Sequence, residues 1–73
     1  MSKPIDIPLT KYRDSEGNTY GVERTLRTGK YIVVRTNAGG HRKGYGRIPA
    51  MNHPAPLQRM LNDEAKNLGW QTV

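Results

Sequence analysis

The apolar residues of this chain change their spacing once, near residue 50, and this change limits the possible folds more than any other feature. In the run "KYIVVRT", Ile32 and Val34 fall on one face, while Tyr31, Val33 and Arg35 fall on the other. Such a period of two indicates β-strands. Later apolar side chains recur at steps of three and four residues, at Leu57, Met60, Leu61, Ala65 and Leu68. That period indicates a helix, so we predict an α+β fold.

Turn signals divide the first part of the chain into hairpins. "DSEG", with Gly17, separates "LTKYR" from "NTYGVERTLR", in which Tyr20, Val22 and Leu26 share a face. "TG" at 28–29 separates that run from "KYIVVRT", and a third, glycine-rich turn precedes "YGRIP". Glycine and small polar residues at these places favour tight turns. We predict a small antiparallel β-meander of three or four strands over residues 9–49, with "YGRIP" as its fourth strand.

The last third of the chain predicts one C-terminal helix over residues 56–68, packed across this sheet. Prolines stand near its start, with His53 at the helix entry, and Gly69 stands where a left-handed cap would end it. Trp70 is then placed to pack back onto the last turn. We expect residues 1–73 to form a single domain with a flexible N-terminus over about 1–8, and both termini to fray.

Length and composition exclude several classes of protein. A chain of 73 residues buries only roughly 60% of its unfolded surface, so its core must be small. It has no cysteine, and therefore neither a disulfide framework nor a thiolate metal site. No apolar run approaches the roughly 20 residues that cross a bilayer, and "MSKPIDIPL" lacks a hydrophobic signal core. We expect a soluble chain that stays where it is made, with no membrane partner.

The sequence offers no constellation for catalysis. His41 and His53 stand twelve residues apart, without a cysteine or a spaced carboxylate that would complete a metal site. Ser2 and Ser15 lie in a terminus and a turn, where a nucleophile and its base have no scaffold. "GYGR" contains Gly-x-Gly, but Ile48 follows where a phosphate loop needs further glycine and a helix start. We therefore expect no enzyme activity, no catalytic residue, no metal and no cofactor.

Positive charge is concentrated in the middle of the chain. Twelve Lys and Arg stand against six Asp and Glu, which gives a net charge of +6. The window from Arg24 to Arg47 contains no acidic residue and seven basic ones: Arg24, Arg27, Lys30, Arg35, Arg42, Lys43 and Arg47. A positive field of this kind attracts nucleic acids and acidic protein surfaces alike.

One hypothesis places this window in a nucleic-acid groove. Arg24, Arg35, Arg42, Lys43 and Arg47 would then contact phosphates, and Tyr31 or Tyr45 would stack on a base. A three-stranded sheet packed on one helix is also the general shape of plant AP2-type domains and of phage integrase arm-binding domains. "GKYIVVR" is similar to the second strand of such domains, over seven residues. A solvated basic hairpin without a partner is the plainer alternative.

A second hypothesis places a protein on the same surface. The row Tyr31, Val33 and Arg35 would supply exposed anchors, unless Ile5, Ile7 or Leu9 fold over Val33. The glycines between 39 and 46 would let an edge strand accept a strand from the partner. The candidate partner-binding residues are Arg24, Lys30, Tyr31, Val33, Arg35, His41, Arg42, Lys43, Tyr45 and Arg47.

A resemblance favours this second hypothesis. The whole chain, from "MSKPIDIPL" through "KYIVVRTNAGGHRKGYGR" to "NLGWQTV", resembles small RNA polymerase-binding transcription regulators of lytic Xanthomonas phages. The resemblance implies that the chain acts as a monomer in the cytoplasm of the infected bacterial host. It implies binding to the N-terminal part of the polymerase β′ subunit, inhibition of initiation by displacement of σ factor, and antitermination. Nucleic acid would be at most a weak, non-specific second contact. The resemblance assigns no role to any single residue.

Overall fold

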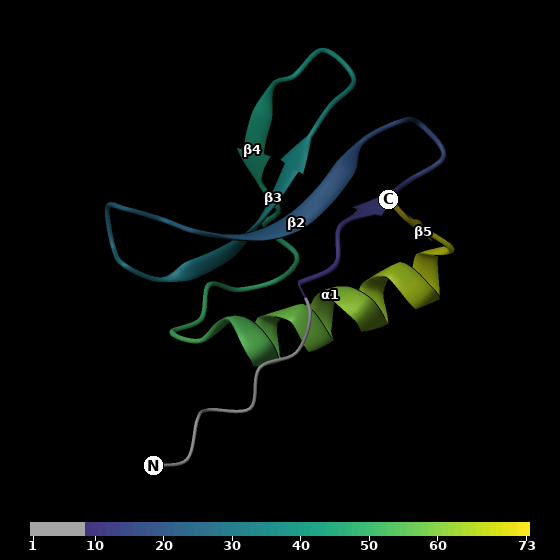
Figure 1. Cartoon of the computed structure of the whole chain (residues 1–73). Coiled ribbons are helices and arrows are strands. Elements are labelled where there is room, and N and C mark those ends of the chain that lie inside the picture. Colours follow the sequence, from purple (N-terminus) through teal and green to yellow (C-terminus); the bar gives the residue numbers. More distant parts are fainter. Residues whose placement is uncertain (1–8) are drawn as a thin grey trace.

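The computed structural model describes residues 9–73, so the segment predicted to be flexible, 1–8, lies outside the described residues. Its elements are β1 (Tyr12–Arg13), β2 (Thr19–Arg24), β3 (Tyr31–Thr36), β4 (Arg42–Gly44), α1 (Pro54–Leu68) and β5 (Gln71–Thr72). The strands form one antiparallel sheet in the order β4-β3-β2-β1-β5, with α1 lying along it (Figure 1). The predicted α+β class, an antiparallel meander with one C-terminal helix, is confirmed, and β5 adds a short strand that was not predicted.

Turns are present at the three predicted places, but the second is a loop of residues 25–30 rather than a tight turn at 28–29, and the fourth strand begins earlier than expected. The Asn37 side chain closes the third turn, since its Oδ1 accepts hydrogen bonds from the backbone N–H groups of Gly39 and His41, at 2.9 and 3.0 Å. Because this turn is tight, pairing resumes at once and Arg42 stands opposite Thr36. The prediction of a strand at "YGRIP" is therefore wrong. Residues 45–50 form the connection to the helix instead.

Helix α1 covers one face of the sheet and creates the core. Its buried side consists of Leu57, Gln58, Leu61 and Ala65, which pack with Tyr20, Val33 and Ile48. Met60 and Leu68, which the spacing placed on the apolar stripe, are exposed. Gln58 is fully buried, and its Nε2 donates to the Thr10 carbonyl oxygen at 3.1 Å and to Asn62 Oδ1 at 2.8 Å.

The covering helix overturns one part of the docking hypothesis. Val33 is completely buried and Tyr31 is half-buried, so only Arg35 of the predicted anchor row is exposed. The face that carries Tyr31 and Val33 is the one that α1 occupies, because both residues pack in the same cluster as Leu57 and Leu61. The predicted exposed row is therefore wrong for two of its three residues.

The helix begins two residues earlier than predicted and ends as expected. His53 is the N-cap residue, and Pro54 and Pro56 occupy the first turn, where a missing N–H breaks no helical hydrogen bond. Gly69 adopts the left-handed conformation (φ 74°), and its N–H donates to the Ala65 carbonyl oxygen. At the C-terminus, Gln71 and Thr72 pair with β1.

In residues 9–73 no helix has both the length and the apolar character that crossing a membrane requires.

Candidate functional site

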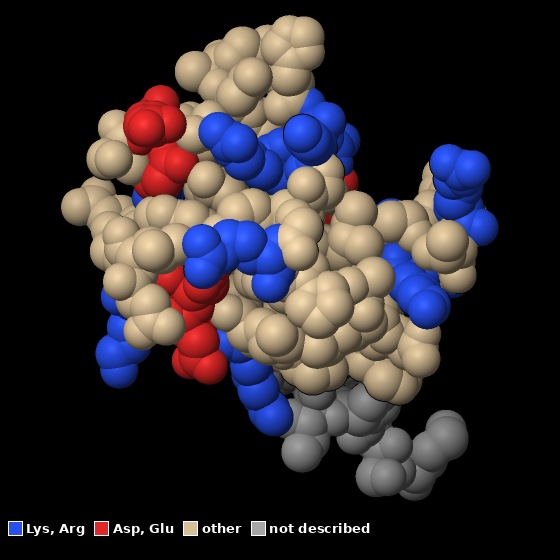
Figure 2. Space-filling view, turned by 180° about the vertical axis from the view of Figure 1, so that it is seen from behind, with Lys and Arg blue, Asp and Glu red and all other residues tan. Residues whose placement is uncertain are grey.

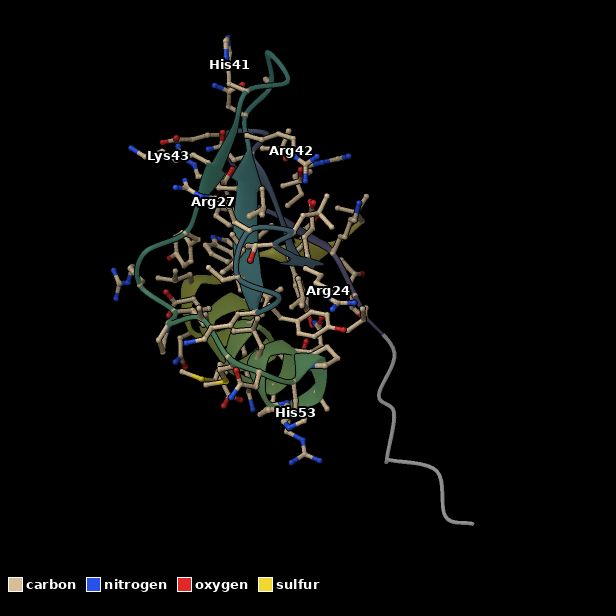
Figure 3. The ribbon with its side chains drawn as sticks, turned by 90° about the vertical axis from the view of Figure 1, so that its left-hand side faces the viewer. Arg24, Arg27, His41, Arg42, Lys43 and His53 are labelled. Carbon is tan, nitrogen blue, oxygen red and sulfur yellow. The ribbon has the colours of Figure 1, made fainter. Side chains whose placement is uncertain are left out.

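The ten candidate residues do not share one surface. Val33 lies in the core, Tyr31 and Tyr45 are half-buried, and the seven basic or histidine side chains are exposed. Figure 3 shows His41 at the tip of the β3–β4 hairpin, with Lys43 and Arg42 projecting to opposite sides of it. Arg24 lies toward the other end of the sheet in this view. Figure 2 shows basic side chains in separate groups with uncharged surface between them.

Tyr45, one of the two tyrosines expected to stack on a base, is part of an internal aromatic cluster. Tyr20 and Trp70 stack with ring centroids 3.8 Å apart and planes at 8°, and Tyr45 meets Tyr20 edge-on at 5.1 Å. The Tyr45 hydroxyl donates to Glu64 Oε2 at 2.7 Å. Burial and this hydrogen bond raise the pKa of Tyr45 to about 12. Tyr45 therefore serves the fold.

Two of the candidate cations have an acidic partner within the chain. Arg42 forms an ion pair with Glu23 of β2. The Nε of Arg47 lies 3.2 Å from Glu64 Oε2. Both acidic partners stand outside the acid-free window of the sequence, and only the fold brings them to it. Fewer cations of the window therefore lack an acidic partner than the sequence suggested.

The cations that remain on the β3–β4 hairpin are Arg35 and Lys43. Together with Asn37 and His41 they make up what we call the hairpin site. Arg35 stands directly opposite Lys43, and the backbone N–H of Asn37 donates to the His41 carbonyl oxygen, at 2.9 Å. Residues two apart along a strand share a face, so these four side chains occupy one side of the hairpin. They line a surface hollow of about 150 Å³. Sequence analysis did not include Asn37, although the Asx-turn pattern "NAGG" could have indicated it.

A second exposed basic region lies at the loop of residues 25–30, between β2 and β3. Arg24 directly precedes it, Arg27 and Lys30 lie within it, and all three side chains are exposed. The Thr25 N–H donates to the Lys30 carbonyl oxygen at 2.8 Å, and the Gly29 N–H to the Thr25 carbonyl oxygen at 2.9 Å. Leu26, predicted to share a strand face with Tyr20 and Val22, is 98% exposed because the strand ends at Arg24 and the chain turns before reaching it.

A second hollow, of about 180 Å³, is lined by Arg13, Asp14, Ser15, Gly69 and Gln71. Asp14 accepts hydrogen bonds from the backbone N–H groups of Glu16 and Asn18, from Asn18 Nδ2, and from the Tyr20 hydroxyl. Burial raises the pKa of its carboxyl, but the hydrogen bonds from Asn18, Tyr20 and Glu16 outweigh this effect and bring the pKa to about 2. Asp14 thus holds the first hairpin together and is a poor general base.

Comparisons with known proteins add no information about the function of this chain. No protein-family model, curated protein or solved structure matches the chain. In the described part of the chain, no three His, Cys, Asp or Glu side chains are grouped closely enough to hold a metal ion. What the arrangement can do chemically is bind anionic groups at the hairpin site and at the loop of residues 25–30.

Proposed function

We propose that this chain is a phage-encoded regulator that binds RNA polymerase in the cytoplasm of an infected bacterium. It inhibits initiation by displacing σ factor and promotes antitermination. The resemblance of the whole chain to regulators of lytic Xanthomonas phages supplies the partner, with the N-terminal part of the β′ subunit as the contact. The hairpin site supplies the docking surface.

One observation supports a protein partner most strongly: the exposed cations of the hairpin site stand beside an open sheet edge. β4 is the last strand in the sheet order, and all three of its residues are exposed. An open edge offers regularly spaced main-chain donors and acceptors, which match the backbone of a polypeptide. Cations next to it favour an acidic protein segment.

The nucleic-acid alternative has weaker support. A protein that follows a duplex needs cations along a continuous track and gains from exposed aromatic rings. Here Arg42 and Arg47 are paired with Glu23 and Glu64, and Tyr45 packs against Tyr20 and Trp70. Within the acid-free window, the cations without such partners in the described residues stand at the hairpin site and at the loop of residues 25–30. Weak, salt-sensitive contact with DNA is what such a distribution supports.

The mechanism is occupancy rather than turnover. A 73-residue chain offers a small interface, so it displaces a larger factor by holding polymerase in a state that binds σ poorly. The two bindings are then coupled reciprocally, and σ weakens binding of this chain by the same factor. Two cationic regions on one small domain suit such a role, because each can contact a different part of the polymerase.

Binding to purified components tests the proposal. Core RNA polymerase, immobilised on a sensor surface, should bind the chain saturably, and excess σ should lower its apparent affinity. A 20-base-pair duplex, as a parallel probe, should bind weakly, with affinity that falls steeply as salt rises. Tight, sequence-specific DNA binding together with no binding to polymerase would overturn the proposal and favour the groove-binding alternative.

A further inference from the structure

Two cations of the hairpin site are neighbours that repel one another. Tyr20, Arg35 and Lys43 form one row across β2, β3 and β4, because the register places Tyr20 opposite Arg35 and Arg35 opposite Lys43. Like charges directly opposite each other in an antiparallel sheet are destabilising. Neither Arg35 nor Lys43 takes part in either of the salt bridges within residues 9–73. The fold therefore retains a repulsion that it does not relieve here.

The other side of the same strand is arranged differently. Arg42, one residue before Lys43, projects to the opposite side of the hairpin (Figure 3) and forms its ion pair with Glu23 of β2. The chain thus gives the cation on one side of β4 an acidic partner and leaves Arg35 and Lys43, on the other side, outside both salt bridges of the described residues. Because of this contrast, we expect an external carboxylate to gain the most electrostatic interaction energy beside Arg35 and Lys43.

The hydrogen-bond pattern shows which main-chain groups of β4 face outward. The Tyr45 N–H donates to the Val33 carbonyl oxygen at 2.8 Å, and the Asn37 N–H donates to the His41 carbonyl oxygen at 2.9 Å. Because such bonds alternate along an antiparallel pair, Lys43 directs its main-chain groups toward β3. Arg42 and Gly44 therefore direct theirs away from the sheet, where a further strand could pair with them.

We infer that an extended segment of the partner adds to the β4 edge with an acidic side chain opposite Lys43. In an antiparallel addition this position is a non-hydrogen-bonded pair, in which facing side chains come closest. The carboxylate would extend the row of Arg35 and Lys43 into the hollow that Asn37 and His41 also line. The inference rests on the proposed function for the identity of the partner, and it adds the segment's conformation and the charge at one position.

The local geometry favours a peptide carboxylate over a nucleic-acid phosphate. The outward groups of Arg42 and Gly44 include N–H donors and carbonyl acceptors, and a phosphodiester backbone offers nothing that donates to the acceptors. Asn37 Oδ1 is committed to the Gly39 and His41 N–H groups, which leaves Nδ2 as the donor that this side chain can offer to an oxyanion.

Hydrogen exchange tests the strand addition directly. The chain is exposed to D₂O free and bound to purified core polymerase, quenched in acid, and read by mass spectrometry with fragmentation. The amides of Arg42 and Gly44 should exchange at least about tenfold more slowly in the complex, since strand pairing would protect them. If a complex forms and both amides exchange as they do in the free chain, the inference is wrong while the proposed function stands.

Substitutions at residue 43 test the charge. Lys43→Gln should raise the Kd for core polymerase about tenfold, and Lys43→Glu should raise it further, mostly through faster dissociation. Arg59→Glu makes the same charge reversal at an exposed helix position and should change the Kd less than about threefold. Trp70 fluorescence and thermal unfolding verify that each variant is folded.

These measurements distinguish failure of the proposed function from failure of the inference. If the wild-type chain does not bind polymerase, the proposed function fails. If it binds and Lys43→Glu binds equally well, only the inference fails. Loss of duplex binding in Lys43→Glu, with polymerase binding unchanged, would assign the hairpin site to nucleic acid instead.

Discussion

At the scale of single residues, two leucines lie in opposite environments. Leu61 is fully buried between α1 and the sheet, whereas Leu26 is 98% exposed on the loop between β2 and β3. Hydrophobicity alone does not distinguish them, since both follow an alternating or helical apolar pattern. What separates them is where each element ends.

Leucine substitutions should reflect this difference. Leu61→Ala should lower the free energy of unfolding by about 2–5 kcal/mol, because it removes buried methyl groups and leaves a cavity. Leu26→Ala should change that free energy by less than about 0.5 kcal/mol. Urea unfolding followed by Trp70 fluorescence measures both. Equal effects of the two substitutions would mean that the assigned core is wrong.

The charged residues show the limit of sequence interpretation at this scale. The sequence identified the exposed cations of the hairpin correctly, because runs of Arg and Lys are seldom buried. It could not identify the partners of Arg42 and Arg47, since Glu23 and Glu64 reach them only through sheet register and helix packing. Val33 was misplaced for the same reason: alternation shows that two faces differ, but not which one the helix covers.

At the scale of elements, helix α1 was the most predictable part. Its period, its prolines and Gly69 are local signals that need no knowledge of the rest of the fold. β4 and β5 were not predictable in the same way. β4 follows from the tightness of the turn at residues 37–40, and two-residue β5 exists because β1 lies beside it.

The helix cap gives a second test. Gly69 has φ 74°, and a Cβ added there would meet nothing within 4 Å, so Gly69→Ala should lower the free energy of unfolding through backbone strain alone, by about 1 kcal/mol. Gly46→Ala is the matched control, because its added Cβ also meets nothing within 4 Å and its φ lies outside the left-handed region. Thermal unfolding compares them. A loss in Gly46→Ala as large as that in Gly69→Ala would contradict the cap assignment.

At the scale of the whole molecule, the aromatic cluster links the sheet, the connection and the C-terminus. Burial and the hydrogen bond to Asp14 raise the pKa of Tyr20 to about 12, and burial and the hydrogen bond to Glu64 do the same for Tyr45. The ordinary tyrosine pKa is 10.0. The folded chain thus holds these protons more tightly than the unfolded chain does.

Alkaline pH should therefore destabilise the fold. The contribution of both tyrosines to the free energy of unfolding is fully present below about pH 10 and is lost as pH rises toward about 12. Over this interval the unfolded chain binds fewer protons than the folded chain does. Urea unfolding at about pH 9 and about pH 11 measures the loss, and absorbance at about 295 nm follows tyrosine ionisation. Tyr45→Phe should show a smaller loss over this interval than the wild-type chain. An identical loss in the variant would mean that Tyr45 ionises in the folded chain as it does in the unfolded one.

The central claim is that polymerase docks on the hairpin site, and paired charge removals test it most directly. Arg35→Gln with Lys43→Gln removes two positive charges from the hairpin site, and Arg24→Gln with Lys30→Gln removes two from the loop end of the same sheet. Association and dissociation rates with core polymerase are measured for both double variants across a salt series. The first should dissociate at least about tenfold faster at every salt concentration, as buried anchors do. The second should mainly associate more slowly, with a difference that shrinks as salt rises. Equal behaviour of the two variants, or wild-type kinetics in both, would contradict the claim.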